Sequence, residues 1–178
     1  MTASSTIDTR ISEFFLAFLE GTGWYSPDYS KAEPIFWGKN QGCDFLRTKC
    51  LNTNLQTAFP THYCTKLDVD SCTFSNEAYG VCGTTVTRKS SSLLSAYDYW
   101  GDKRIVIDSF ADNCPYYYSY TSTECKDASN SAINLDGGEY FGAESNCFTG
   151  TLNSGSTLPF CFKNTVHSKK FFLLKVIH

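Results

Sequence analysis

The sequence is poor in histidine and has no long apolar run. Its three histidines are His62, His167 and His178, and none belongs to an HExxH motif, which would place two imidazoles and a glutamate base on one helical face. The chain also lacks a GxSxG elbow, a P-loop and a phosphate-binding GxGxxG. No stretch approaches the ~18 apolar residues of a membrane-spanning helix. The residues alone therefore show no complete active site, although a Cys/His nucleophilic pair stays open at this point.

Two short polar features near the middle of the chain invite a metal-binding interpretation. His62 follows Pro60 in a loop, where a single histidine is more often a surface residue than a ligand. Asp68-Val-Asp70 resembles a metal-binding DxD sequence, but an exposed acidic loop is the simpler interpretation. The chain has a net charge of −3 and a pI near 5.6, and its sequence contains no basic stripe. Nucleic acid is therefore not an expected partner.

Nine cysteines give the strongest compositional signal. No two are closer than seven residues, so the CxxC pairs typical of structural zinc sites are absent. Nine free buried thiols would be rare at this density, and disulfides formed in an oxidising compartment explain the pattern better. Nine is odd, so one cysteine has no partner within the chain. Met1 is followed by Thr-Ala-Ser-Ser-Thr without a signal peptide, so we expect the N-terminal part of a longer, exported protein to be missing.

The hydrophobic pattern predicts few regular elements. Ile7, Ile11, Phe14, Phe15, Phe18 and Leu19 recur at helical spacing and predict a helix over residues 6–21. Thr6, Asp8 and Thr9 are its candidate N-caps, and Gly21 is its expected end. An aromatic-anchored extended loop is expected from Trp24 to Gly42, and small apolar clusters are expected in place of one deep core.

Short elements are expected in the rest of the chain. Helical turns are predicted at residues 44–51 and 75–81, the second capped by Ser75. Strands are predicted at 104–110 and 116–118, where β-branched and aromatic residues gather. Residues 119–157 are rich in Ser, Thr, Asn and Gly and are predicted to form loops pinned by Cys125 and Cys147.

A series of motifs resembles one protein family. The motifs are Phe18-Leu-Glu-Gly-Thr-Gly-Trp-Tyr25, Tyr29-Ser-Lys-Ala-Glu33, Trp37-Gly38, Gly42-Cys-Asp-Phe-Leu46 and Lys49-Cys50, followed by Tyr63-Cys64, Cys72-Thr-Phe74, Gly80-Val-Cys82, Asp112-Asn-Cys-Pro115 and Asn146-Cys-Phe148. Together they are similar to the leishmanolysin family of zinc metalloproteases. The resemblance covers roughly residues 1–161 and corresponds to the family's region from its methionine turn onward.

The resemblance implies a zinc enzyme whose metal ligands lie outside this chain. The family holds zinc with HExxH and a distant third histidine, all upstream of the methionine turn. Met1 matches the methionine under the metal, and Thr2, Ala3, Ser4 and Ser5 would line the pocket for the primed side of a substrate. Zn²⁺ is thus the expected cofactor of the intact parent, with none bound by this chain and no catalytic residue in it.

The resemblance also implies a disulfide pattern. Carried over residue by residue, it pairs Cys50 with Cys114, Cys64 with Cys82, Cys72 with Cys147, and Cys125 with Cys161. It leaves Cys43 unpaired, because the family counterpart of Cys43 bonds a cysteine in the upstream part.

The expected architecture is an α+β fold in which a short helix from the protease's C-terminal lobe precedes a loop-rich, disulfide-stapled domain. Residues 1–37 would end the catalytic domain, 38–161 would form the cysteine-rich domain, and 162–178 a divergent basic-hydrophobic tail. The leading hypothesis is the C-terminal part of an extracellular or cell-surface metalloendopeptidase, inactive alone, whose partners are the missing catalytic part and protein or peptide substrates. The resemblance also allows the parent to associate with a membrane. The alternative is a non-catalytic cysteine-rich surface or adhesion module.

Overall fold

The computed structural model describes residues 9–83, 88–89, 94–101, 104–105, 112–132, 138–151 and 156–164. Its few helices, small antiparallel sheets and four disulfides confirm the α+β class. In chain order the elements are α1 (Glu13–Gly21), η1 (Tyr29–Lys31), α2 (Asp44–Arg47), β1 (Asp70–Cys72), β2 (Ala78–Cys82), β3 (Arg88–Lys89), η2 (Ser95–Tyr97), β4 (Arg104–Ile105), β5 (Tyr117–Glu124), η4 (Ala128–Ala132), β6 (Ser145–Thr151) and β7 (Thr157–Lys163).

The first helix is shorter than the apolar periodicity predicts. It begins after Ser12, whose Oγ accepts a hydrogen bond from the Phe15 backbone N–H at 3.3 Å. Thr9 lies before the helix and is not its cap, while the other two candidate caps lie outside the described residues. A serine oxygen satisfies one of the N–H groups that the first turn leaves without a partner, which explains the start. The helix ends at Gly21, as predicted, and is capped by Thr22.

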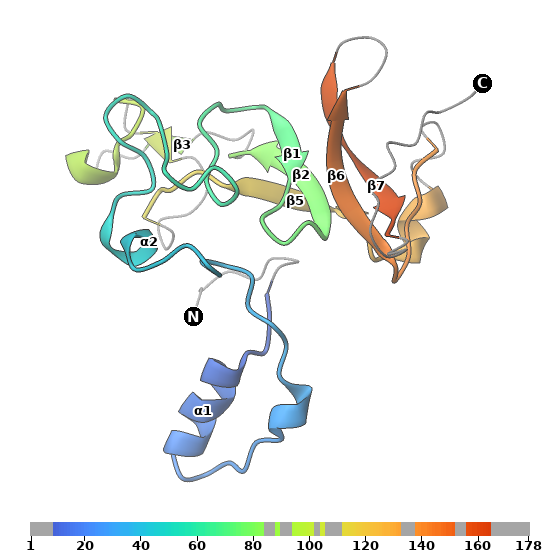
Figure 1. Cartoon of the computed structure of the whole chain (residues 1–178). Helices are drawn as coiled ribbons and strands as arrows, with labels where there is room; N and C mark the ends of the chain where they lie inside the picture. The colour runs from blue at the N-terminus through green and yellow to red at the C-terminus, as the bar shows by residue number, and fades with distance from the viewer. Residues whose placement is uncertain are drawn as a thin grey trace.

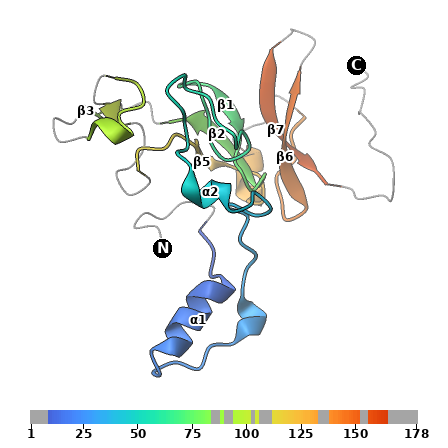
Figure 2. The ribbon, with the colours of Figure 1, turned by 60° about the vertical axis from the view of Figure 1, so that its left-hand side comes forward.

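Residues 11–35 form an arm that extends away from the rest of the molecule, the body (Figures 1 and 2). Within the arm, the Tyr29 hydroxyl donates a 2.7 Å hydrogen bond to Glu20 Oε2 and so ties η1 to α1. At its base, the backbone N–H of Glu33 donates to the Ile11 carbonyl, and the Ile11 N–H donates to Glu33 Oε2. The arm is therefore a closed loop held at its two ends.

The central sheet has the strand order β1-β2-β5, and both pairings are antiparallel. The helical turn predicted at 75–81 is wrong, because Ala78–Cys82 is the middle strand of this sheet. Four of its five residues are buried, and pairing on both sides satisfies its backbone groups. Ser75 caps no helix; its Oγ accepts from the Glu77 N–H in the turn that leads into β2. The strand predicted at 116–118 is confirmed as β5, which runs on to Glu124.

A hairpin of β6 and β7 lies beside the sheet (Figure 1). Loops predicted throughout 119–157 are therefore wrong for both β5 and β6. Threonine is favourable in a β-strand. A segment in which threonine alternates with small residues nevertheless lacks the apolar–polar alternation from which a strand is predicted. Of the strand predicted at 104–110, Arg104 and Ile105 form β4, which pairs with β3, and the remainder lies outside the described residues. The helical turn predicted from residue 44 is confirmed as the shorter α2.

Disulfides connect these elements. The bonded pairs are Cys50–Cys114, Cys64–Cys82, Cys72–Cys147 and Cys125–Cys161, which are the four that the family resemblance implies. All nine cysteines lie in the described part of the chain, and there Cys43 is free and exposed. Cys147 and Cys161 face each other across the hairpin, yet each bonds a different segment and so anchors β6 and β7 separately.

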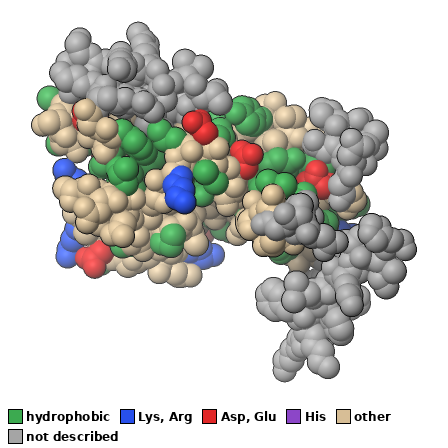
Figure 3. Space-filling view, turned by 90° about the horizontal axis from the view of Figure 1, so that it is seen from above, with side chains coloured by type: hydrophobic (Ala, Val, Ile, Leu, Met, Phe, Trp, Pro, Cys, Tyr) green, Lys and Arg blue, Asp and Glu red, His purple; other side chains and the backbone are tan. Residues whose placement is uncertain are grey.

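Buried apolar residues form two small clusters, as expected. One lies between α2 and the loop after it and contains Phe45, Cys50, Leu51, Phe59 and Tyr63. The other lies around two disulfides and contains Cys125, Phe141, Cys147 and Cys161. On the face opposite the arm, side chains of both charges are scattered singly among polar and hydrophobic ones (Figure 3).

Candidate functional site

The sequence-predicted site residues lie at the start of the chain. Met1 and the segment from Thr2 to Ser5 fall outside the described residues, so their assigned roles stay predictions. The described chain offers three other features with functional chemistry: a buried histidine among aromatic rings, a polar pocket beside it, and the exposed surface of the arm.

Trp37 joins the arm to the body through a set of ring contacts. The centroid of its ring lies 4.9 Å from that of Phe74, 5.5 Å from that of Phe45 and 5.3 Å from that of His62, all edge-to-face. We call Trp37 and these three rings the aromatic hub. Each edge-to-face pair of this kind stabilises a fold by about 0.5–1.5 kcal/mol, in addition to the stabilisation from burying its apolar surface. The hub therefore fixes where the arm leaves the body.

His62 is buried in the hub, with 5% of its surface exposed, so the expectation of a surface histidine is wrong. Its backbone N–H donates to the Phe59 carbonyl in a tight turn that directs the ring inward. Its Nε2 accepts a 3.0 Å hydrogen bond from the Gly38 N–H, and its Nδ1 lies 2.9 Å from Thr61 Oγ1. Burial lowers the pKa of His62, although a hydrogen bond with the Phe36 backbone opposes part of that shift. The neutral imidazole is therefore the form that the fold favours.

The donor set of the described residues does not fit a catalytic zinc ion. No group of three His, Cys, Asp or Glu side chains converges within the described ranges. Both ring nitrogens of His62 are already engaged, and eight of the nine cysteines form disulfides. Asp68 and Asp70 are exposed, as predicted, but the prediction of a loop is wrong for Asp70, which begins β1. We therefore assign no catalytic step to zinc on these residues.

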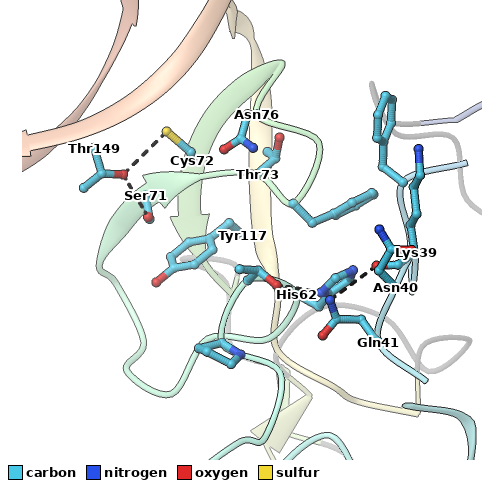
Figure 4. Close-up of a pocket in the computed structure, with 14 residues that line it drawn as sticks. Lys39, Asn40, Gln41, His62, Ser71, Cys72, Thr73, Asn76, Tyr117 and Thr149 are labelled. Carbon is cyan, nitrogen blue, oxygen red and sulfur yellow. Dashed lines mark hydrogen bonds between the residues drawn. The ribbon is translucent and has the colours of Figure 1, made fainter. Parts of the chain in front are cut away.

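A polar pocket of about 430 Å³ lies next to the hub (Figure 4). One wall is the turn that contains Lys39, Asn40 and Gln41, and the opposite wall carries Ser71 of β1 and Tyr117 of β5. No sequence pattern predicts this pocket, because its walls come from segments that are far apart along the chain.

The arm exposes large apolar side chains. Of the nine residues of α1, Leu16 is the buried one. Phe14 is 79% exposed, Phe18 is 57% exposed, and Trp24 just after the helix is 86% exposed. Several large apolar side chains exposed on one short segment are typical of an interaction site. The helical stripe seen in the sequence thus lies largely on the outside of the described structure.

Comparison with known proteins identifies the family. The family model for leishmanolysin, peptidase family M8, matches residues 1–165. The chain belongs to the leishmanolysin family. This is a family of metallopeptidases, and the match covers the arm, the hub and every disulfide described above.

Sequence identity to individual members of the leishmanolysin family supports the same assignment. The chain is 32% identical to leishmanolysin of Leishmania chagasi over 79% of its own length and 23% of that protein. It is 32% identical to the leishmanolysin homolog of Crithidia fasciculata, over 80% of this chain and 22% of the relative. It is 28% identical to a leishmanolysin-like peptidase of Caenorhabditis elegans, over 83% of this chain and 27% of the relative. The chain thus spans about a quarter of the length of these relatives. Among the described residues, no helix of this leishmanolysin-family chain has the length and hydrophobicity to cross a bilayer.

Proposed function

We propose that this chain is the C-terminal part of a leishmanolysin-like zinc metalloendopeptidase that hydrolyses proteins or peptides outside the cell or at its surface. Family membership supports the activity, and the four disulfides support an oxidising compartment. In this proposal residues 1–37 end the catalytic domain, 38–161 form the cysteine-rich domain, and the tail from 162 diverges. The chain spans about a quarter of its relatives, so the zinc ligands and the general base would come from the preceding part.

The observation that carries this proposal is the uncovered apolar surface of the arm. Phe14, Phe18 and Trp24 together expose aromatic area that costs free energy in water. A helix of nine residues is marginal in isolation, and amphipathic helices gain most of their stability from packing. We therefore propose that the arm packs against the preceding catalytic part. Docking there would bury the stripe and place Met1 and its following residues beside the metal.

Cys43 supports the same arrangement. It is exposed and precedes α2 directly. The helix α2 lies on the side of the body from which the arm extends (Figure 1). An exported protein seldom keeps an exposed free thiol, and the other eight cysteines are bonded. We propose that the partner of Cys43 is a cysteine of the preceding part, which would bond the two parts covalently next to the arm.

A proteolysis assay tests the proposal that catalysis depends on the preceding part and not on this chain alone. The purified, oxidised 178-residue chain is incubated with casein, with and without Zn²⁺, beside a full-length leishmanolysin as positive control. We expect no zinc-dependent cleavage by the chain, because its described side chains offer no three-ligand metal group. Zinc-dependent proteolysis that persists through purification and is abolished by a chelator would overturn the proposal.

The second candidate function is a cysteine-rich surface or adhesion module without catalysis. The observation in its favour is the body itself, which is stapled by four disulfides and carries a polar pocket that needs no catalytic residue. Sequencing the transcript upstream of the Met1 codon separates the two candidates. An in-frame HExxH followed by a third histidine supports the protease, and its absence supports the module.

A further inference from the structure

The polar pocket beside the hub has a composition that neither proteolysis nor the disulfide framework requires. It is formed by fourteen residues of the described chain and encloses about 430 Å³, within the range of small-molecule sites. Figure 4 shows Lys39, Asn40 and Gln41 on one side of the opening, with Ser71 and Tyr117 on the other. Because its walls come from a turn, a loop and two strands, its shape is set by the tertiary fold.

Several polar groups in this pocket lack a protein partner. The side chains of Asn40, Asn76, Tyr117 and Lys39 make no hydrogen bond or ion pair to any residue in the described part of the chain. These groups can therefore hydrogen-bond with water or with a ligand. A ligand that replaces this water must offer several hydrogen-bonding groups in return, because an unpaired polar group costs about 1–3 kcal/mol.

Two aromatic rings add apolar surface to the same pocket. Phe74 is held by Trp37 at 4.9 Å and is stacked on His62, with 12° between the ring planes. This packing fixes the Phe74 ring, which is one of the residues that line the pocket. Phe36 lies on the wall of the turn, where its ring is 5.8 Å from Lys39 Nζ. The pocket thus combines flat apolar faces with amides and hydroxyls, which suits a ligand that is hydroxylated at its edge and carries C–H groups on its face.

Charge narrows the ligand class. Among the fourteen lining residues of the described chain, Lys39 is the charged one, His62 is favoured in its neutral form, and no Asp or Glu occurs. A single cation among neutral donors and acceptors favours one negative charge on the ligand. We propose that this pocket binds one acidic sugar unit of a glycan, of the hexuronic or sialic acid class. Its carboxylate faces Lys39, its hydroxyls contact Asn40, Asn76 and Tyr117, and its ring lies on Phe74.

The inference is independent of the proposed protease function. No lining residue is a predicted catalytic or metal-binding residue, and none belongs to residues 11–35 of the arm. Glycan binding would position the protein at a glycosylated surface whether or not it is part of an active enzyme.

A nuclear magnetic resonance titration of the oxidised 178-residue chain tests the inference. The probes are methyl β-D-glucuronide, the neutral methyl β-D-glucoside, and sodium acetate. We expect saturable shifts of the side-chain amides of Asn40, Gln41 and Asn76 with the glucuronide, smaller shifts with the glucoside, and no shift of Asn54 in a distant turn. Equal shifts with acetate alone would indicate a simple carboxylate site and would overturn the saccharide assignment, as would the absence of saturable shifts at these amides.

Two conservative variants sharpen the test. Tyr117→Phe removes one hydroxyl and is expected to weaken glucuronide binding about fivefold, the usual effect of one hydrogen bond. Lys39→Gln is expected to remove the preference for the glucuronide over the glucoside. The matched controls, Tyr118→Phe on the opposite face of β5 and Lys31→Gln in the arm, should bind like the original chain. If the pocket variants and their controls bind equally, the proposal is wrong; an unchanged amide spectrum shows that each variant is folded.

Discussion

At the scale of single residues, His62 shows how burial changes chemistry. Its ring lies among Trp37, Phe45 and Phe74, and its Nε2 accepts a hydrogen bond from the Gly38 N–H. A proton on Nε2 would remove that acceptor and place a charge inside the hub. Burial accordingly lowers the pKa of His62 from its ordinary value of 6.5.

The lowered pKa makes stability depend on pH. Below pH 6.5 the unfolded chain binds a proton at His62 before the folded chain does, so the free energy of unfolding is highest above this pH and falls as the pH drops through the folded-state pKa. We expect His62→Gln, which keeps an oxygen to accept from Gly38, to flatten this dependence. Urea midpoints between about pH 7.5 and 5 measure it.

Two carboxylates with shifted pKa values titrate outside this window. The pKa values of Asp28 and Asp127 are lowered from 3.8 by hydrogen bonds from Ser30 and Ser129, so these carboxylates titrate at more acidic pH. Equal pH dependence in the His62→Gln variant and the original chain would show that His62 does not control stability in this range.

At the scale of elements, the packing of β2 against β5 depends on a glycine. Gly80 pairs with Ser71 on one side and with Ser119 on the other, next to an irregularity in the β2–β5 register. A Cβ built on Gly80 would collide with the backbone carbonyl of Tyr118, which cannot move without disturbing the strand. The strands β2 and β5 therefore approach each other too closely at Gly80 to leave room for a side chain.

We expect Gly80→Ala to destabilise the chain by about 3 kcal/mol, because the overlap is with backbone and not with a flexible side chain. Gly150→Ala in β6 is the matched control, since a Cβ there has no atom within 4 Å. Thermal and urea unfolding of the oxidised proteins give the difference. Equal stability of the two variants would mean that β2 and β5 can separate at Gly80 without loss.

At the scale of the whole molecule, the body and the arm differ in how they are held. The body has four disulfides and two buried clusters. The arm is attached by the hub and by an ion pair between Arg10 and Glu77, and its aromatic side chains face outward. The chain alone therefore exposes surface whose burial needs a partner.

This exposed surface predicts self-association. Replacing Phe14, Phe18 and Trp24 together by serine should lower both dye binding by exposed apolar surface and concentration-dependent association several-fold. The urea midpoint, followed by circular dichroism, should stay unchanged, because these side chains are 57–86% exposed. Leu46→Ser, at an 87% exposed position on α2 outside the arm, is the control and should change neither property. Undiminished association of the triple variant would locate the adhesive surface elsewhere.

The fold was predictable where local chemistry decides the structure. The helix ends at Gly21, as predicted, and Gly23 follows the C-cap with a φ of 73°, a left-handed backbone that glycine adopts without strain. The helix α2 begins at Asp44, as predicted. The helix start was missed because three polar residues before Ser12 are, by residue type, equally favourable N-caps. The strand β6 was missed because Ser, Asn, Thr and Gly make up most of it, so it shows no clear hydrophobic period, and pairing with β7 and a disulfide hold it in place.

The family, the oxidised framework and the odd cysteine follow from the sequence, because motifs and cysteine counts can be read without coordinates. Three further features are visible in the folded chain: His62 is buried and neutral, Gly80 lies against Tyr118, and a polar pocket forms between the turn at Lys39 and the sheet. These features depend on contacts between residues far apart in the chain. Their energies come from burial and close packing, which no local pattern encodes.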